Sequence, residues 1–219
     1  AAGLPDDDIP LRDGGTGARA YAEAVSVYLA FAVDRCADYW SSLVRWQNVN
    51  QQMSNTFGRQ ALPMLWDFVE ANPFSSSNGS FNNLFSWTIQ SIPWLPLNAT
   101  GNALQHDATT IDMPGRNIIV STDPPYYDNI GYADLSDYFY IWMRQSLREV
   151  NPDVFGTVLV PKEPELIASP YRHGSKEAAN EHFESGLQQT FVNLRRYISG
   201  EYPLTVYYAF KQQDAASDG

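Results

Sequence analysis

Asp123, Pro124, Pro125 and Tyr126 combine a hydrogen-bond acceptor, a rigid turn and an aromatic ring within four consecutive residues. They come one residue after 117–121, an apolar, β-branched run that predicts a strand buried on both faces, as in a parallel sheet. The prolines fix the turn and hold its backbone carbonyl in place, because neither carries an N–H. Open α/β sheets bind ligands just past the carboxyl ends of their strands. The pattern therefore predicts a ligand site, and the purely structural alternative is a tight turn.

The run 118–122 leading into these four residues resembles motif IV of the amino-methyltransferases, which methylate the exocyclic nitrogen of adenine or cytosine. That nitrogen is a poor nucleophile because its lone pair is delocalised into the ring. The resemblance implies a catalytic motif in which the Asp123 carboxylate and the Pro124 carbonyl accept the amino hydrogens and stabilise positive charge developing on nitrogen. Tyr126 would stack on a base flipped out of the duplex, a contact worth roughly 1–3 kcal/mol.

The resemblance extends to residues 59–74 and 126–140, which look like segments of a family of large bacterial adenine-specific DNA methylases, some with a zinc ribbon. It covers most of the chain. It implies an α/β, Rossmann-like methyltransferase fold that uses S-adenosylmethionine, and a DNA substrate. Tyr126, Tyr127 and Tyr132 are then the expected substrate-binding residues, with the last two lining the base pocket.

The segment 101–108 ends in Asp107 and Ala108, which resemble the strand-end Asp-Ala on the cofactor side of that family. The resemblance implies that Asp107 accepts a hydrogen bond from the adenine amino group of S-adenosylmethionine and that Ala108 lines the adenine slot. The alternative is that Asp107 simply caps a turn.

One expected feature of a complete enzyme is missing, namely a glycine-rich turn directly after a strand, where the backbone approaches the cofactor closely. The glycine-rich residues 13–17 precede a helix but follow no apolar strand, and residues 72–80 also lack one. The sequence therefore looks like a C-terminal portion of a longer methylase. The missing N-terminal portion would supply much of the cofactor pocket and the DNA-binding surface.

The composition of the 219-residue chain is globular, with 44% hydrophobic and 18% charged residues. Its formal charge of −11 and only 14 Lys and Arg argue against tight, autonomous binding to duplex DNA, so DNA is expected to be held through the full-length protein. The single cysteine, Cys36, permits no intramolecular disulfide and no zinc site built from cysteines, and no metal site is predicted. No signal peptide or membrane span is evident, and a cytoplasmic location is expected.

Periodicity and turn residues predict a mainly helical segment over 1–92 and an α/β methyltransferase half over 93–219, which could form one continuous domain. Helices are predicted over 18–47, 59–70, 80–91, 135–150 and 177–198, with Pro63 breaking the second of them or starting a turn there. Strands are predicted over 100–105, 117–121 and 202–210. Asp134 or Ser136 is the expected N-cap of the fourth helix. Strands alternating with helices after residue 95 favour an open α/β sheet.

Three functions remain open from the sequence. The first is DNA methylation, with adenine N6 favoured over cytosine N4. The second is amino-methylation of RNA or of protein glutamine, since such enzymes use a closely similar Pro-Pro-Tyr turn. The third is a catalytically inert structural or interaction module of methyltransferase fold, consistent with the acidic charge and the missing glycine-rich turn.

Overall fold

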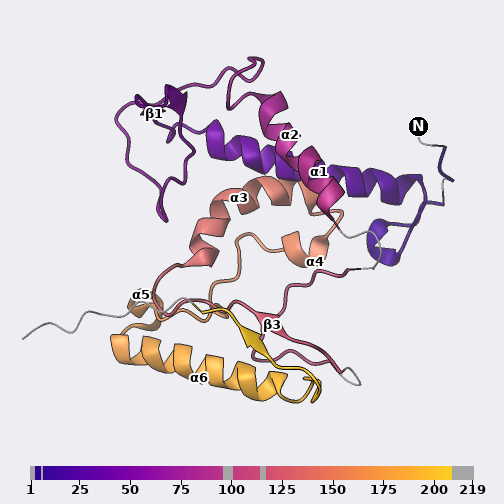
Figure 1. Cartoon of the computed structure of the whole chain (residues 1–219), viewed down its shortest axis with the longest axis vertical. Coiled ribbons are helices and arrows are strands. Elements are labelled where there is room, and N and C mark those ends of the chain that lie inside the picture. The colour runs from indigo at the N-terminus through magenta and orange to yellow at the C-terminus, as the bar shows by residue number, and fades with distance from the viewer. Residues whose placement is uncertain (1–2, 6, 96–100, 114–116, 209–219) are drawn as a thin grey trace, which may run out of the picture. The chain divides into compact units, whose positions relative to one another are not determined.

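The computed structural model describes residues 3–5, 7–95, 101–113 and 117–208. This part of the chain is mostly helical, with short strands in two two-stranded sheets (Figure 1). It divides into two compact units, the first of Ala1–Asn102 with Ala133–Val160 and the second of Ala103–Tyr132 with Pro161–Gly219. The division differs from the segments 1–92 and 93–219 drawn from the sequence, because residues 133–160 group with the N-terminal residues.

The first unit contains α1 (Ala18–Tyr39) and α2 (Phe81–Ser91). Its other elements are η1 (Leu11–Asp13), β1 (Trp46–Gln47), β2 (Gln52–Met53), η2 (Ile92–Trp94), α3 (Tyr132–Leu147) and α4 (Pro152–Phe155). The strands β1 and β2 form an antiparallel hairpin. The second unit contains β3 (Ser121–Thr122), α5 (Pro170–His173), α6 (Lys176–Leu194) and β4 (Thr205–Val206).

The predicted helix over 18–47 is correct at its start but ends at Tyr39. The last carbonyls of α1 are bound by residues from later in the chain, because the Asp38 carbonyl accepts both the N–H and the hydroxyl of Thr56, each at 2.7 Å. The Trp40 indole donates to the Gly79 carbonyl at 2.8 Å. These long-range contacts end the helix, and residues 46–53 form the hairpin instead.

The predicted helix over 59–70 is wrong, since this stretch is irregular throughout. Pro63 lacks an N–H, and the Asp67 carboxylate accepts the N–H of Phe68 at 2.9 Å, which competes with helical pairing. The Val69 N–H instead donates to the Val44 carbonyl at 3.0 Å. Leu62, Met64 and Phe68 remain exposed, and Trp66 is fully accessible.

The other helix predictions are confirmed in location, and serine caps explain two of the starts. The Ser80 hydroxyl accepts the Asn83 N–H before α2, and the Ser175 hydroxyl accepts the Ala178 N–H before α6. The N-cap predicted for the helix over 135–150 is wrong, because this helix, α3, already begins at Tyr132 and both Asp134 and Ser136 lie inside it.

The predicted open α/β sheet is not seen within the described residues, which form no Rossmann sheet. A parallel pair is present, in which Ser121 pairs with Thr205 and Thr122 with Val206. The strand predicted over 117–121 is therefore shortened and shifted to β3, and the strand over 202–210 contracts to β4, with residues 209–210 outside the described part. Residues 101–105 form no strand. Burial of β3 on both faces is also wrong, because the side chains over 117–122 alternate between exposed and half-buried.

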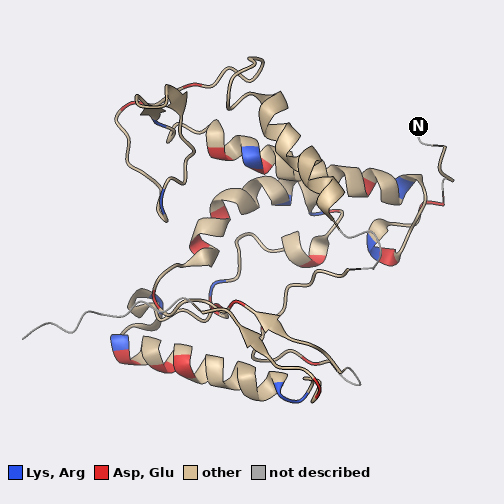
Figure 2. Cartoon of the chain, viewed as in Figure 1, with Lys and Arg blue, Asp and Glu red and all other residues tan. Residues whose placement is uncertain are grey.

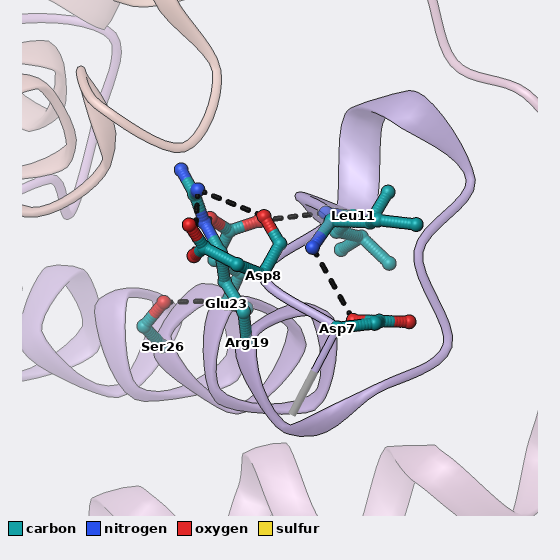
Figure 3. A network of polar contacts seen from close by, with 7 residues as sticks. Asp7, Asp8, Leu11, Arg19, Glu23 and Ser26 are labelled. Atoms are coloured by element: carbon teal, nitrogen blue, oxygen red, sulfur yellow. Dashed lines mark hydrogen bonds and ion pairs between the residues drawn. The ribbon is translucent and has the colours of Figure 1, made fainter. Parts of the chain in front are cut away.

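The glycine-rich segment 13–17 packs against the residues that precede it at the start of α1. Arg19 reaches back to the Asp8 carboxylate at 3.1 Å and pairs with Glu23 at 3.0 Å along the helix (Figure 3). The Leu11 N–H donates to Glu23 at 2.7 Å, and this bond, helped by Arg19, holds the pKa of Glu23 below its ordinary value. The segment therefore holds the preceding residues against the start of α1, and we call this arrangement the N-terminal closure of α1.

Replacing Gly15 with alanine should detach this closure. An alanine Cβ would lie 2.1 Å from the Ile9 carbonyl oxygen and 2.9 Å from that of Pro10, and backbone atoms cannot swing aside as a flexible side chain can. We expect faster hydrogen exchange at the Ala18 amide, which donates to the Pro5 carbonyl. Gly58→Ala is the matched control, because nothing lies within 4 Å of its Cβ position. Unchanged exchange at Ala18 in Gly15→Ala would contradict this role.

Candidate active site

The predicted catalytic residues 123–126 directly follow the carboxyl end of β3 in the second unit. Backbone bonds from Thr205 N–H to the Val120 carbonyl at 3.1 Å and from Tyr207 N–H to the Thr122 carbonyl at 2.8 Å hold β3 beside β4. The turn beginning at Asp123 ends where the Asn129 N–H donates to the Tyr126 carbonyl at 2.9 Å. The motif thus follows a paired parallel strand, as the sequence predicted.

Asp123 and Tyr126 contact each other directly within this turn. The Tyr126 hydroxyl donates to Asp123 Oδ1 at 2.6 Å, and the Asp123 carboxylate is exposed. This hydrogen bond, with smaller contributions from burial and from the negative charge of Asp123, raises the pKa of Tyr126 above its ordinary value of 10.0. The hydrogen bond to Asp123 therefore favours the protonated phenol, which is the donor.

The ring of Tyr126 has a second aromatic neighbour on the residues after β4. The rings of Tyr126 and Tyr208 meet edge to face, with centroids 5.5 Å apart and an interplanar angle of 85°. Tyr132 makes a further small electrostatic contribution to the raised pKa of Tyr126, and its side chain is 48% exposed. The turn therefore brings Asp123, Tyr126 and Tyr132 together at a surface that also carries Tyr208.

Tyr127 points in a different direction from its neighbour Tyr126. Its φ of 46° lies in the left-handed region, which costs a non-glycine residue roughly 1–2 kcal/mol. Its hydroxyl donates to the side-chain oxygen of Asn180 on α6, and its ring meets Phe183 edge to face at 5.4 Å. The Tyr127 carbonyl accepts the Ala168 N–H at 3.0 Å. Its phenol is thus engaged with α6, and its expected place in a base pocket stays a prediction.

Asp107 forms the turn that the sequence left open as an alternative. Its Oδ1 accepts the N–H of Thr109 at 2.8 Å and the hydroxyl of the same residue at 2.7 Å, and its carbonyl accepts the Thr110 N–H. Buried Asn193 of α6 donates to the Ile111 carbonyl at 2.7 Å just beyond this turn. Asp107 is half-buried and Ala108 exposed, and the cofactor roles expected of both stay predictions.

Residues 162–173 form a polar cluster beside α6, where the sequence indicated only a solvated loop between helices. The Arg172 guanidinium donates to Glu165 at 2.6 Å and to the Lys162 carbonyl at 3.2 Å, and the Arg172 and Glu165 side chains are both largely buried. The rings of His173 and His182 stack with centroids 4.1 Å apart. A signal for the short helix α5 was present, because Pro170 at its start and Gly174 just after its end mark a single helical turn.

His173 should make this cluster sensitive to acid. Burial, with the charges of His182 and Arg172, lowers the pKa of His173 below its ordinary value of 6.5, and its Nε2 is buried without a hydrogen-bond partner. As the pH falls, His173 is therefore protonated in the unfolded chain before it is protonated in the folded chain. The resulting contribution to stability is complete above pH 6.5 and is lost as the pH falls through the lower folded pKa.

We expect the urea midpoint to fall on acidification from about pH 7.5 to about pH 5 more steeply in the wild type than in His173→Gln. His106→Gln is the matched control because His106 is exposed in the same unit. Equal pH dependence in all three proteins would show that His173 does not contribute.

A groove of about 560 Å³ in the first unit contains none of these residues. Arg35, a cation in its lining, lies over the rings of Tyr39 and Trp87 and is 3.6 Å from Asp38. The rest of the lining is largely apolar: Leu11, Ala24, Val27, Tyr28, Phe31, Trp87, Thr88, Ser91 and Leu95. We assign no ligand to this groove, because its cation is already engaged.

Within the described ranges, no group of three or more His, Cys, Asp or Glu side chains is arranged to hold a metal ion. None of the helices described there is both long and apolar enough to cross a membrane.

Comparisons with protein-family models, with curated proteins and with solved structures gave no match to this chain. The site must therefore be interpreted from its own geometry and chemistry.

Proposed function

We propose that this chain is the target-amine portion of an S-adenosylmethionine-dependent DNA methyltransferase, with adenine N6 favoured over cytosine N4. The observation that supports this most is the exposed Asp123 carboxylate, placed one residue after a parallel strand, with the Tyr126 ring held beside it. A carboxylate and an aromatic ring at the carboxyl end of a strand suit a planar base bearing an amino group.

The fold we propose for the parent protein is a Rossmann-like α/β sheet to which β3 and β4 contribute. Support comes from the parallel pairing of these strands and from the position of α6, which lies between them in the chain. Parallel strands need a crossover connection, and in α/β proteins that connection is usually a helix. The remaining strands and much of the cofactor pocket would come from the missing N-terminal portion.

The chemistry proposed for this chain is positioning and charge stabilisation. Asp123 and the Pro124 carbonyl accept the two amino hydrogens, while Pro125 keeps the turn rigid and Tyr126 stacks on the base. The cofactor supplies the methyl group.

The described residues do not themselves form a cradle for S-adenosylmethionine. The glycine-rich segment near the N-terminus is filled by its own chain, because the Cβ positions of Gly15 and Gly17 lie within 3 Å of atoms of residues 5–10. Asp107 already uses Oδ1 in a turn. We therefore propose that the cofactor binds the full-length protein, with Asp107 and Ala108 contributing one wall.

The acidic character of the chain shapes the proposal for DNA. In Figure 2 the ribbon of α6 begins with a basic position, continues with acidic ones along its first half, and is followed by basic positions beyond its end; these are Lys176, then Glu177, Glu181 and Glu184, and then Arg195 and Arg196. This mixed order offers no continuous basic face for phosphates. DNA is then held by the parent protein, with only the target base reaching this chain.

Isothermal titration calorimetry with S-adenosylmethionine tests the proposal on this chain and on the full-length protein. We expect binding by the full-length protein alone, followed by transfer of labelled methyl to DNA. Labelling of RNA or of protein glutamine instead would move the function to those substrates. Failure of the full-length protein to bind S-adenosylmethionine would leave a structural or interaction module as the function.

A further inference from the structure

Two consecutive tyrosines in the second unit have side chains that contact different parts of that unit. Tyr126 contacts Asp123 and Tyr208 at the exposed turn, whereas Tyr127 contacts Asn180 and Phe183 on α6. The left-handed backbone of Tyr127 separates them, because its φ of 46° reverses the local chain direction. Such a conformation persists in a bulky residue only where surrounding contacts enforce it.

Three independent contacts enforce this conformation. The ring of Tyr127 packs against the buried cluster of Ala168, Ala179 and Phe183. Its hydroxyl donates to the Asn180 side-chain oxygen, and its carbonyl accepts the Ala168 N–H at 3.0 Å. The residue directly after the motif is therefore fixed at its ring, its hydroxyl and its backbone.

We propose that Tyr127 is a positioning residue, and that its hydrogen bond to Asn180 holds the Asp123–Tyr126 turn in the geometry that receives the target amine. This inference rests on the proposed function, but its structural part can be tested without activity. Tyr127 then contacts no substrate. Because Tyr127 is hydrogen-bonded to α6 and covalently linked to Tyr126, it fixes the position of the turn relative to α6.

The hydrogen bond gives the proposal a specific chemical test, because Tyr127 is the donor and Asn180 the acceptor. Asn180→Ala and Tyr127→Phe each remove the bond, and Asn180→Asp keeps an acceptor oxygen at the same place. In the full-length protein we expect kcat to fall about 3- to 10-fold in the first two variants. We expect a smaller effect on the KM for DNA than on kcat, no further loss in the double variant and recovery in Asn180→Asp. The matched controls Tyr171→Phe and Gln188→Ala, both at exposed positions of the same unit, should retain wild-type kcat.

A second measurement on the same variants separates this proposal from the proposed function. The Asn129 amide closes the turn on the Tyr126 carbonyl, so its hydrogen exchange reports the turn directly. We expect faster exchange at Asn129 in Asn180→Ala and in Tyr127→Phe, and wild-type exchange in Asn180→Asp.

An inactive wild-type protein with this exchange pattern would reject the methyltransferase and keep the positioning role. Two results would overturn the inference. One is unchanged Asn129 exchange in both Asn180→Ala and Tyr127→Phe, and the other is a raised KM for DNA at unchanged kcat in Tyr127→Phe, which would make Tyr127 a substrate contact.

Discussion

Asp123→Ala in the full-length protein is expected to lower methyl transfer about 10²- to 10³-fold while binding of S-adenosylmethionine persists. The Asp123 carboxylate faces the amine in our proposal and makes no contribution to the cofactor pocket. Its loss removes an acceptor that acts mainly in the transition state, so kcat should fall more than the affinity for DNA. Methyl-transfer kinetics and cofactor calorimetry on the same variant measure the two effects.

The conservative variant Asp123→Asn keeps one acceptor oxygen but loses the negative charge, so its rate should lie between those of wild type and Asp123→Ala. Glu201→Gln is the matched control, because it removes an exposed carboxylate from the same unit. Wild-type activity in Asp123→Ala would remove Asp123 from the mechanism.

Tyr126→Ala is expected to raise the KM for DNA about 5- to 150-fold, which corresponds to losing one base-stacking contact of roughly 1–3 kcal/mol. Tyr126→Phe should keep the KM close to wild type, because it preserves the ring and removes only the hydroxyl that donates to Asp123. Steady-state kinetics over a range of DNA concentrations separate the two variants.

The control for Tyr126→Ala is Tyr171→Ala, since the Tyr171 side chain is 97% exposed in the same unit. If Tyr126→Phe were as impaired as Tyr126→Ala, the hydroxyl would matter more than the ring. Stacking would then not explain the position of Tyr126.

Apolar periodicity predicted the location of most of the helices, because it depends on residues three and four positions apart in the chain. Ser80 and Ser175 cap α2 and α6 through hydroxyls that accept N–H groups three residues later. The motif was likewise found from the apolar run before Asp123 and from the two prolines. These features depend on neighbours in the sequence and can be read without a structure.

The features that the sequence did not predict depend on distant partners. The end of α1 is set by Thr56, which lies 18 residues beyond Asp38 in the chain. The hydrogen bond between Tyr127 and Asn180 spans 53 residues and leaves no periodic pattern. The strand expected over 100–105 does not form at residues 101–105, where Leu104 is the only large apolar side chain, and residue 100 lies outside the described part.

The most direct test of the central claim is to incubate the full-length protein with S-adenosylmethionine and unmethylated DNA, and then to analyse the digested nucleosides by mass spectrometry. We predict N6-methyladenine in the wild-type reaction, its absence in the Asp123→Ala reaction, and wild-type amounts with Glu201→Gln. Absence of a methylated amino group in wild-type DNA, with the cofactor shown to bind, would contradict the assignment of Asp123 to a DNA-methylating site.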